Sequence, residues 1–143
     1  MSGRLILGID EGTTAVKAAL FDEELRPVRE ARRIVGVRHP QPGWVEKDAP
    51  EILDAVVDLV AELLADAPGE VVACGLDHEG ESVLAWDGVT GAPLTPVVVW
   101  QDKRSAVVLD GLLGDEAEIR RRSGLPLDPY FSAGKLAWLL RHD

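Results

Sequence analysis

The stretch Leu5–Asp22, read as LILGIDEGTTAVKAALFD, constrains the fold more than any other part of the sequence. Two apolar runs, Leu5–Ile9 and Ala15–Phe21, flank a short polar turn. The first run is unbroken and rich in β-favouring residues, which predicts a strand buried on both faces. The second run alternates loosely, as a strand does. We therefore expect a β-hairpin at the start of a sheet.

The turn of this hairpin, Asp10-Glu11-Gly12-Thr13-Thr14, carries groups that suit a phosphate. Gly12 allows a positive φ and a close approach to the backbone. Thr13 and Thr14 add two hydroxyls and two amide donors, and Asp10 ends the strand where its carboxylate could orient a hydrated Mg²⁺. On these residues alone an ordinary hairpin is the better interpretation, because a lone Gly-containing turn is weak evidence.

Length and charge narrow the class of protein. The 143 residues suit one domain, and no linker, repeat or low-complexity segment interrupts them. The net charge of -10 argues against general nucleic-acid binding. We interpret the single basic cluster, Arg120-Arg121-Arg122, as a solvated helix end.

The sequence also indicates a compartment. No apolar stretch reaches the roughly 18 residues that cross a membrane, and the N-terminus lacks the features of a signal peptide. The lone cysteine, Cys74, lies in an apolar run and is expected to be a buried thiol. A reducing cytoplasm fits these observations best.

The clearest helix begins after Asp48, an N-cap residue with Glu51 three residues later as in a capping box. Apolar residues then recur at helical spacing until Pro68-Gly69. Val71–Leu76 is predicted as another buried strand, parallel to the first, and Val28–Val37 as a charged edge strand. Further strands are expected over 82–86 and 96–100, and helices over 105–113, 115–123 and 134–142, the last with Ser132 as its cap. Trp86 and Trp138 are expected in packing.

Polar residues follow three of the predicted strands. They are Asp10, the group Asp77–Glu81 and the group Trp100–Arg104. Open α/β sheets bind ligands at the carboxyl ends of their strands, so we expect these groups to share one crevice.

Five stretches, in order along the chain, resemble the FGGY family of carbohydrate kinases, and most of all its glycerol kinase branch. They are GIDEGTTAVKAALFD, HPQPGWVEKD, CGLDHEGESVLAWD, TGAPLTPVVVWQDKRS and IRRRSGLPLDPYFSAGKLAWLL. The resemblance implies an α/β fold of the actin-like, ribonuclease H-like type, a mixed sheet flanked by helices. It also implies that residues 1–143 are the N-terminal lobe of a longer, two-lobed kinase.

The resemblance also implies a reaction, the transfer of the γ-phosphoryl group of ATP to a hydroxyl of a polyol or sugar. Residues that match the family's phosphate and Mg²⁺ loop are Asp10, Gly12, Thr13, Thr14 and Lys17, with Asp10 toward the metal. Residues that match substrate-binding positions are Glu81, Trp100 and Tyr130, with Gly80 and Asp102 beside them. The catalytic base of the family, an Asp, is expected outside this chain, so no catalytic residue is assigned here, and the isolated chain is expected to be inactive.

Two positions depart from the glycerol kinase pattern. Lys17 replaces an Arg and loses the guanidinium fork. Gly80 stands where glycerol kinases carry an Arg that would grip two hydroxyls, so the preferred substrate is expected to change, toward a longer polyol or a sugar.

Two other functions remain open on the sequence. One is a binding module that keeps the sugar or nucleotide site but performs no chemistry. The other, an actin-like structural ATPase, leaves Glu81, Trp100 and Tyr130 without a purpose and ranks last. Expected partners are ATP and a small polyol or sugar, with no nucleic acid and no membrane, and self-association into a homo-oligomer stays open.

Overall fold

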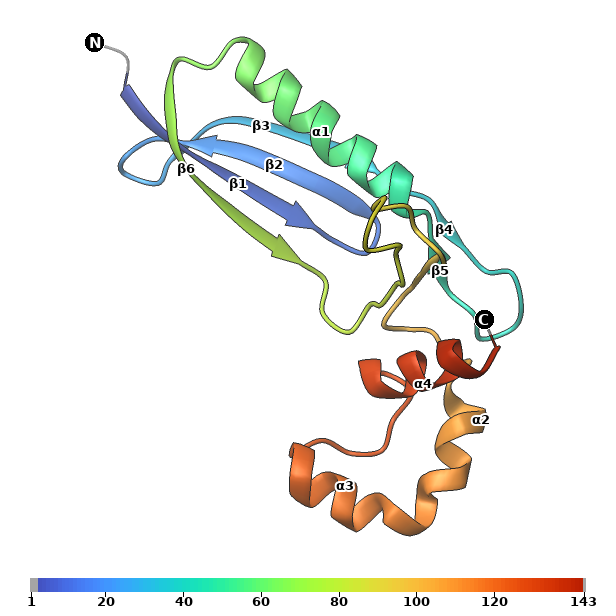
Figure 1. The fold of residues 1–143 in the computed structure, drawn as a ribbon. Helices are drawn as coiled ribbons and strands as arrows, with labels where there is room; N and C mark the ends of the chain where they lie inside the picture. Colours follow the sequence, from blue (N-terminus) through green and yellow to red (C-terminus); the bar gives the residue numbers. More distant parts are fainter. Residues whose placement is uncertain (1–2, 143) are drawn as a thin grey trace. The chain divides into compact units, whose positions relative to one another are not determined.

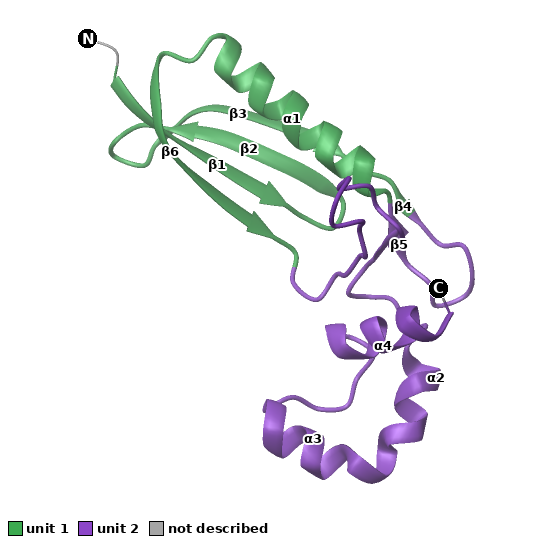
Figure 2. Cartoon of the chain, viewed as in Figure 1, with its two compact units in different colours: residues 1–37, 48–79 green, residues 38–47, 80–143 purple. Residues whose placement is uncertain are grey.

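The computed structural model describes residues 3–142 and divides into two compact units (Figure 2). Unit 1 consists of residues 1–37 and 48–79, and unit 2 of residues 38–47 and 80–143. The sequence shows no sign of this division, because none of the three crossings between the units is marked by a low-complexity or Gly/Ser-rich linker.

Unit 1 is a four-stranded mixed sheet with one long helix on it (Figure 1). Its elements are β1 (Gly3–Glu11), β2 (Ala15–Phe21), β3 (Pro27–Ile34), α1 (Ala49–Ala65) and β6 (Gly69–His78). The strand order is β3-β2-β1-β6. β1 pairs antiparallel with β2 and parallel with β6, which confirms the predicted hairpin and crossover.

Helix α1 begins where the sequence predicts. The Asp48 side chain accepts a hydrogen bond from the Glu51 amide at 3.3 Å, which satisfies one of the free N–H groups of the first turn. The Glu51 carboxylate in turn accepts a hydrogen bond from the Gly36 amide at 2.7 Å. The helix start is therefore tied to the chain that follows β3.

The core of unit 1 lies between α1 and one face of the sheet. From α1 it takes side chains spaced four residues apart, as an amphipathic helix provides them. From β1 and β2 it takes every second residue. The buried members are Leu5, Leu7, Val16, Ala18, Leu20, Val35, Ala55, Leu59 and Leu63.

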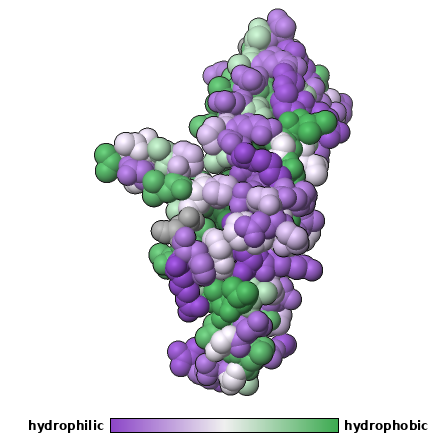
Figure 3. Space-filling view, turned by 90° about the vertical axis from the view of Figure 1, so that its right-hand side faces the viewer, coloured by the Kyte–Doolittle hydropathy of each residue, from purple (hydrophilic) through white to green (hydrophobic). Residues whose placement is uncertain are grey.

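The opposite face of this sheet is open among the described residues of unit 1. The prediction that β1 is buried on both faces is therefore wrong, since Ile6, Gly8 and Ile9 are only half-buried. The burial predicted for Val71–Leu76 and for the Cys74 thiol is also wrong: β6 is an edge strand, and Cys74 is exposed. Hydrophobic patches among hydrophilic ones on the surface in Figure 3 agree with the many exposed apolar side chains, Leu76 and Trp86 among them.

The third strand keeps its predicted edge position but is shorter. β3 ends at Ile34, and the next two-residue strand, β4 (Val37–Arg38), joins a separate sheet of order β4-β5-β7. Gly36 separates the two strands, and its amide is the one that Glu51 binds.

Unit 2 contains short strands and four helical segments (Figure 1). They are β5 (Glu46–Lys47), β7 (Val97–Val98), α2 (Ala106–Leu109), a 3₁₀ helix (Asp110–Asp115), α3 (Glu116–Ser123) and α4 (Ser132–His142). The predicted helices α3 and α4 are present, but α4 begins at Ser132, the residue that was predicted to cap it. Gly124, at φ +76°, ends α3 in the left-handed conformation that glycine adopts most easily.

Four predictions for unit 2 are corrected. The strand predicted over 82–86 is reduced to two isolated bridges, Val83 with Val98 and Trp86 with Pro93, and Trp86 is 61% exposed rather than packed. The strand predicted over 96–100 keeps only two residues, and the helix over 105–113 changes to a 3₁₀ helix after Leu109. Short elements of this kind depend on tertiary contacts more than on local pattern.

The basic cluster lies at the exposed end of α3, as predicted. Arg120 pairs with Glu116, and Arg121 and Arg122 pair with Glu118 one helical turn earlier. Within residues 3–142 no helix has the length and apolar character that a bilayer crossing requires.

Candidate functional site

The hairpin between β1 and β2 closes tightly around Gly12. The Gly12 amide donates to the Ala15 carbonyl at 3.1 Å. The expected positive φ is not found here, because the positive-φ glycines of the described chain are Gly43, Gly91 and Gly124. Glycine suits the position for another reason: a Cβ there would lie 3.2 Å from the Ala15 carbonyl oxygen. The close approach that the sequence predicted is thus made by the hairpin's own backbone.

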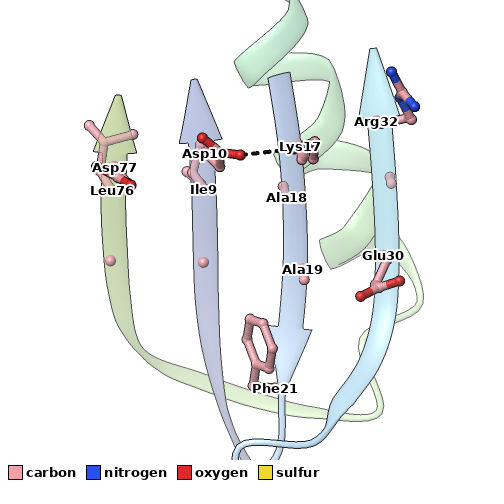
Figure 4. Close-up of a pocket in the computed structure, with 13 residues that line it drawn as sticks. Ile9, Asp10, Lys17, Ala18, Ala19, Phe21, Glu30, Arg32, Leu76 and Asp77 are labelled. Atoms are coloured by element: carbon pink, nitrogen blue, oxygen red, sulfur yellow. Dashed lines mark hydrogen bonds and ion pairs between the residues drawn. The ribbon is translucent and has the colours of Figure 1, made fainter. Parts of the chain in front are cut away.

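Four charged residues form a row across the sheet beside this hairpin, from β6 to β3. In the strand register Asp77 lies opposite Asp10, Asp10 opposite Lys17, and Lys17 opposite Arg32. Figure 4 shows them at the end of the sheet where β1 and β6 finish. Lys17 Nζ is 3.2 Å from Asp10 Oδ2, and both side chains are about half exposed. The two carboxylates lie on the neighbouring strands β6 and β1, and the two cations lie on the next strands, β2 and β3.

These residues line the upper part of a hollow of about 750 Å³ on the open face of the sheet. Its floor is apolar and includes Ile9, Ala19 and Phe21 (Figure 4). Thr13 is half-buried and Thr14 is exposed at the hairpin tip. The predicted phosphate-loop residues Asp10, Gly12, Thr13, Thr14 and Lys17 therefore lie together on one hairpin.

Asp10 and Asp77 are neighbouring carboxylates that line this hollow. No group of three or more His, Cys, Asp or Glu side chains in the described chain is placed to hold a metal ion. Mg²⁺ is commonly held by one or two carboxylates, with water and substrate phosphates completing its shell. Asp10, the hairpin carboxylate that lines the hollow, fits a Mg²⁺ that arrives with phosphates rather than a metal held by protein alone.

Unit 2 contains a second hollow, of about 490 Å³, with aromatic walls. Trp100 and Tyr130 meet edge to face, with ring centroids 5.7 Å apart. Acidic and basic groups, Asp102, Asp128 and Lys103, line the same hollow. Aromatic faces beside a few polar groups are typical of small-molecule sites.

Glu81 is held next to the residues that carry these rings. Its Oε2 accepts hydrogen bonds from the Ser132 amide and hydroxyl, each at 2.7 Å, two residues beyond Tyr130. Ser82 Oγ accepts a hydrogen bond from the Trp100 amide at 3.1 Å. Glu81 has φ +64°, a strained conformation for a residue with a side chain, and such strain is found disproportionately at functional sites.

The same contacts keep Glu81 ionised. The hydrogen bonds from the Ser132 hydroxyl and amide lower the pKa of the Glu81 carboxyl. Burial raises this pKa by less than those hydrogen bonds lower it, and the nearby Lys135 ammonium lowers it a little further. A carboxylate at neutral pH only accepts hydrogen bonds, which suits it to a ligand rich in hydroxyls.

Asp102, another predicted substrate residue, makes several hydrogen bonds within the protein through its side chain. The residue is 1% exposed and its side chain is fully buried. Oδ2 accepts a hydrogen bond from the Val45 amide at 2.6 Å, and both oxygens accept from Arg104 at 2.9 Å. These contacts favour a role in supporting the wall of the hollow.

Arg104 supports the same wall by binding Asp102 and packing against two tryptophan rings. Its guanidinium lies 3.8 Å from the centre of the Trp44 ring and 5.1 Å from that of Trp138, and it also donates to Glu46. Burial lowers the pKa of Arg104, but the hydrogen bonds to Asp102 and Glu46 outweigh it and leave the pKa raised. Trp44 and Trp138 are therefore packing residues around a buried cation.

Gly80 has space around it. A Cβ built on Gly80 would meet no atom within 4 Å, and its φ lies outside the left-handed range. A larger side chain fits at this position without backbone strain.

The predicted residues thus fall into two groups, the hairpin group in unit 1 and the Glu81, Trp100 and Tyr130 group in unit 2. Whether they share one crevice stays a prediction. Sequence reasoning missed Arg32 and Lys135. The only signal for Lys135 was a cation inside the otherwise apolar stretch of the last helix.

Comparison with known proteins decides the family. The model of the N-terminal domain of the FGGY family of carbohydrate kinases matches residues 5–143. This chain belongs to the FGGY family of carbohydrate kinases. Glycerol kinase from Gloeobacter violaceus is 45% identical over 139 residues, 96% of this chain and 28% of that protein. Glycerol kinase from Stenotrophomonas maltophilia is 41% identical over 147 residues, covering 99% and 30%.

Solved FGGY structures have the same fold. The Plasmodium falciparum glycerol kinase with ADP superposes with a TM-score of 0.93 at 31% identity, covering 99% of this chain and 29% of that one. Gluconate kinase from Lactobacillus acidophilus gives a TM-score of 0.90 at 26% identity, with the same coverage. The mixed sheet predicted as actin-like is confirmed. This FGGY chain spans less than a third of the length of these relatives.

Proposed function

We propose that this chain is the N-terminal part of an ATP-dependent kinase that transfers the γ-phosphoryl group to a hydroxyl of a polyol or sugar. The observation that supports this most is the aromatic hollow of unit 2 with Glu81 beside it. A hydroxylated carbon chain has an apolar side that rings such as Trp100 and Tyr130 cover, and hydroxyls that a carboxylate accepts from.

In this proposal the hairpin of unit 1 binds the nucleotide. The amides and hydroxyls of Thr13 and Thr14 donate to phosphate oxygens, and Lys17 balances their charge. When bound, Mg²⁺ would neutralise charge on the phosphates, and Asp10 is the residue that would hold it. The catalytic base is proposed to lie outside residues 1–143, in a second lobe.

The substrate is proposed to be larger than glycerol. Relatives are named glycerol kinase, gluconate kinase and xylulose kinase, so the family's names span polyols, sugar acids and sugars. Gly80 leaves open space where a grip on two hydroxyls is expected in the glycerol kinase branch. A site without that grip favours a ligand that fills the space itself.

The test is ATP consumption by the full-length enzyme that contains this chain, with a panel of glycerol, longer polyols, pentuloses and gluconate. We expect at least one compound to stimulate ADP formation by about tenfold or more over the rate without it. No stimulation by any member would overturn the proposal. Calorimetric binding of a panel compound without ADP formation would indicate the non-catalytic binding module instead.

A further inference from the structure

Lys135 is a buried cation without a role in the function proposed above. Its side chain is 0% exposed, in the first turn of α4. Burying an ammonium group is costly unless partners replace its water. Lys135 has such partners, because Nζ donates to the Pro129 carbonyl at 2.9 Å and to the Tyr130 carbonyl.

Both carbonyls belong to the turn that carries the Tyr130 ring. Within this turn, Asp128 Oδ1 accepts from the Tyr130 amide at 2.8 Å, and the Asp128 carbonyl accepts from the Phe131 amide at 3.2 Å. The Asp128 side chain thus holds the N–H side of the turn, and Lys135 holds its carbonyl side. Both therefore contact the turn whose Tyr130 ring meets Trp100.

The charges around Lys135 connect it to the same hollow. Burial lowers the pKa of Lys135, and the carboxylates of Glu81, Asp102 and Asp128 partly offset this. Asp102 and Asp128 line the hollow, and Glu81 is bonded to Ser132 at the start of the same helix. A cation at this point keeps the group of acidic residues together.

We infer that Lys135 is a positioning residue for the sugar or polyol, fixing the turn at 128–131 so that Tyr130, in contact with Trp100, lies against the substrate. The inference rests on the proposed function. It acts through Tyr130, since Lys135 is fully buried and its Nζ donates to the Pro129 and Tyr130 carbonyls.

The test is Lys135→Met in the full-length enzyme, a change that keeps the length of the side chain and removes the three N–H donors. We expect the KM for the best panel substrate to rise about tenfold or more, while the KM for ATP stays within about twofold. Arg141→Met is the matched control, because it removes an exposed cation from the same helix. It should leave both KM values within about twofold of wild type.

A double-mutant cycle separates positioning from general structure. Tyr130→Ala removes the ring that Lys135 is inferred to position, so adding Lys135→Met to it should raise the substrate KM by no more than about twofold further. Equal rises of both KM values in Lys135→Met, or effects of the two substitutions that multiply, would overturn the inference.

If Lys135→Met does not give folded protein, Lys135→Arg keeps the charge but displaces the donors. A raised KM for the substrate alone supports the inference, and an unchanged substrate KM or equal rises in both values overturn it. Failure here is distinct from failure of the proposed function, which would leave wild type itself without substrate-stimulated ADP formation.

Discussion

Gly80 is the residue on which the proposed preference for a substrate larger than glycerol depends. We predict that Gly80→Arg in the full-length enzyme shifts kcat/KM toward glycerol, relative to the longer substrates, by about tenfold or more. A side chain has room there, since a Cβ would meet no atom within 4 Å.

Gly88→Arg is the matched control for this substitution. A Cβ at Gly88 also meets nothing within 4 Å, and the residue lies in a turn away from the predicted site residues in sequence. Its substrate profile should equal that of wild type. An unchanged profile in Gly80→Arg would show that position 80 does not face the ligand.

A second prediction concerns Asp10, the residue proposed to hold Mg²⁺. Asp10→Asn keeps the shape of the side chain but removes the charge that would place Mg²⁺, so kcat should fall on the order of 10²-fold or more. Steady-state ADP formation measures it. Asp58→Asn, which removes an exposed carboxylate from α1, should keep the wild-type rate. Near-normal turnover of Asp10→Asn would remove Asp10 from the mechanism.

Single residues were predicted well where the family's pattern marked them, and poorly where their role depends on backbone conformation or tertiary contacts. The Trp100–Tyr130 pair was predicted through the family's pattern, and the structure brings the rings together. Gly12 was predicted for the wrong conformation, because sequence cannot tell a positive φ from a close backbone approach. Lys135 was missed because a lysine in a helix is normally exposed, and only tertiary contacts show it buried.

Among the elements, helix α1 has one face buried in the core of unit 1 and one face exposed. Leu59→Ala should lower the free energy of unfolding by about 2–5 kcal/mol, since it leaves a cavity against the sheet. Leu53→Ala, on a side chain that is 62% exposed, should cost under about 1 kcal/mol. Urea unfolding followed by circular dichroism measures both, and equal losses would mean that α1 does not present this face to the sheet.

Elements with a strong local pattern were predicted well. The hairpin and α1, α3 and α4 follow from periodicity within each segment, with the Asp48 cap at the start of α1 and Gly124 at the end of α3. The burial of β6 was not predictable, because it depends on whether another strand or layer covers it. The segment 82–100 was over-assigned as strands, since a short apolar run does not fix its own pairing.

For the whole molecule, Glu81 links stability to pH. Its pKa is lowered in the folded chain from the ordinary value of 4.5, so ionised Glu81 stabilises the fold. This contribution is present above about pH 4.5 and is lost as pH falls through the lowered pKa. The difference in free energy of unfolding between wild type and Glu81→Gln should therefore shrink from pH 7 to pH 3. Urea titrations across that range measure it, and a constant difference would contradict the assigned contacts.

The central claim is that unit 1 holds the phosphates of ATP and unit 2 holds the hydroxylated substrate. The most direct measurement is a crystal structure of the full-length enzyme with ADP, Mg²⁺ and its best substrate. The account predicts density for the ADP phosphates at the Thr13 and Thr14 amides, and density for the substrate beside Trp100, Tyr130 and Glu81. Substrate density elsewhere, with the hollow of unit 2 filled by water alone, would contradict it.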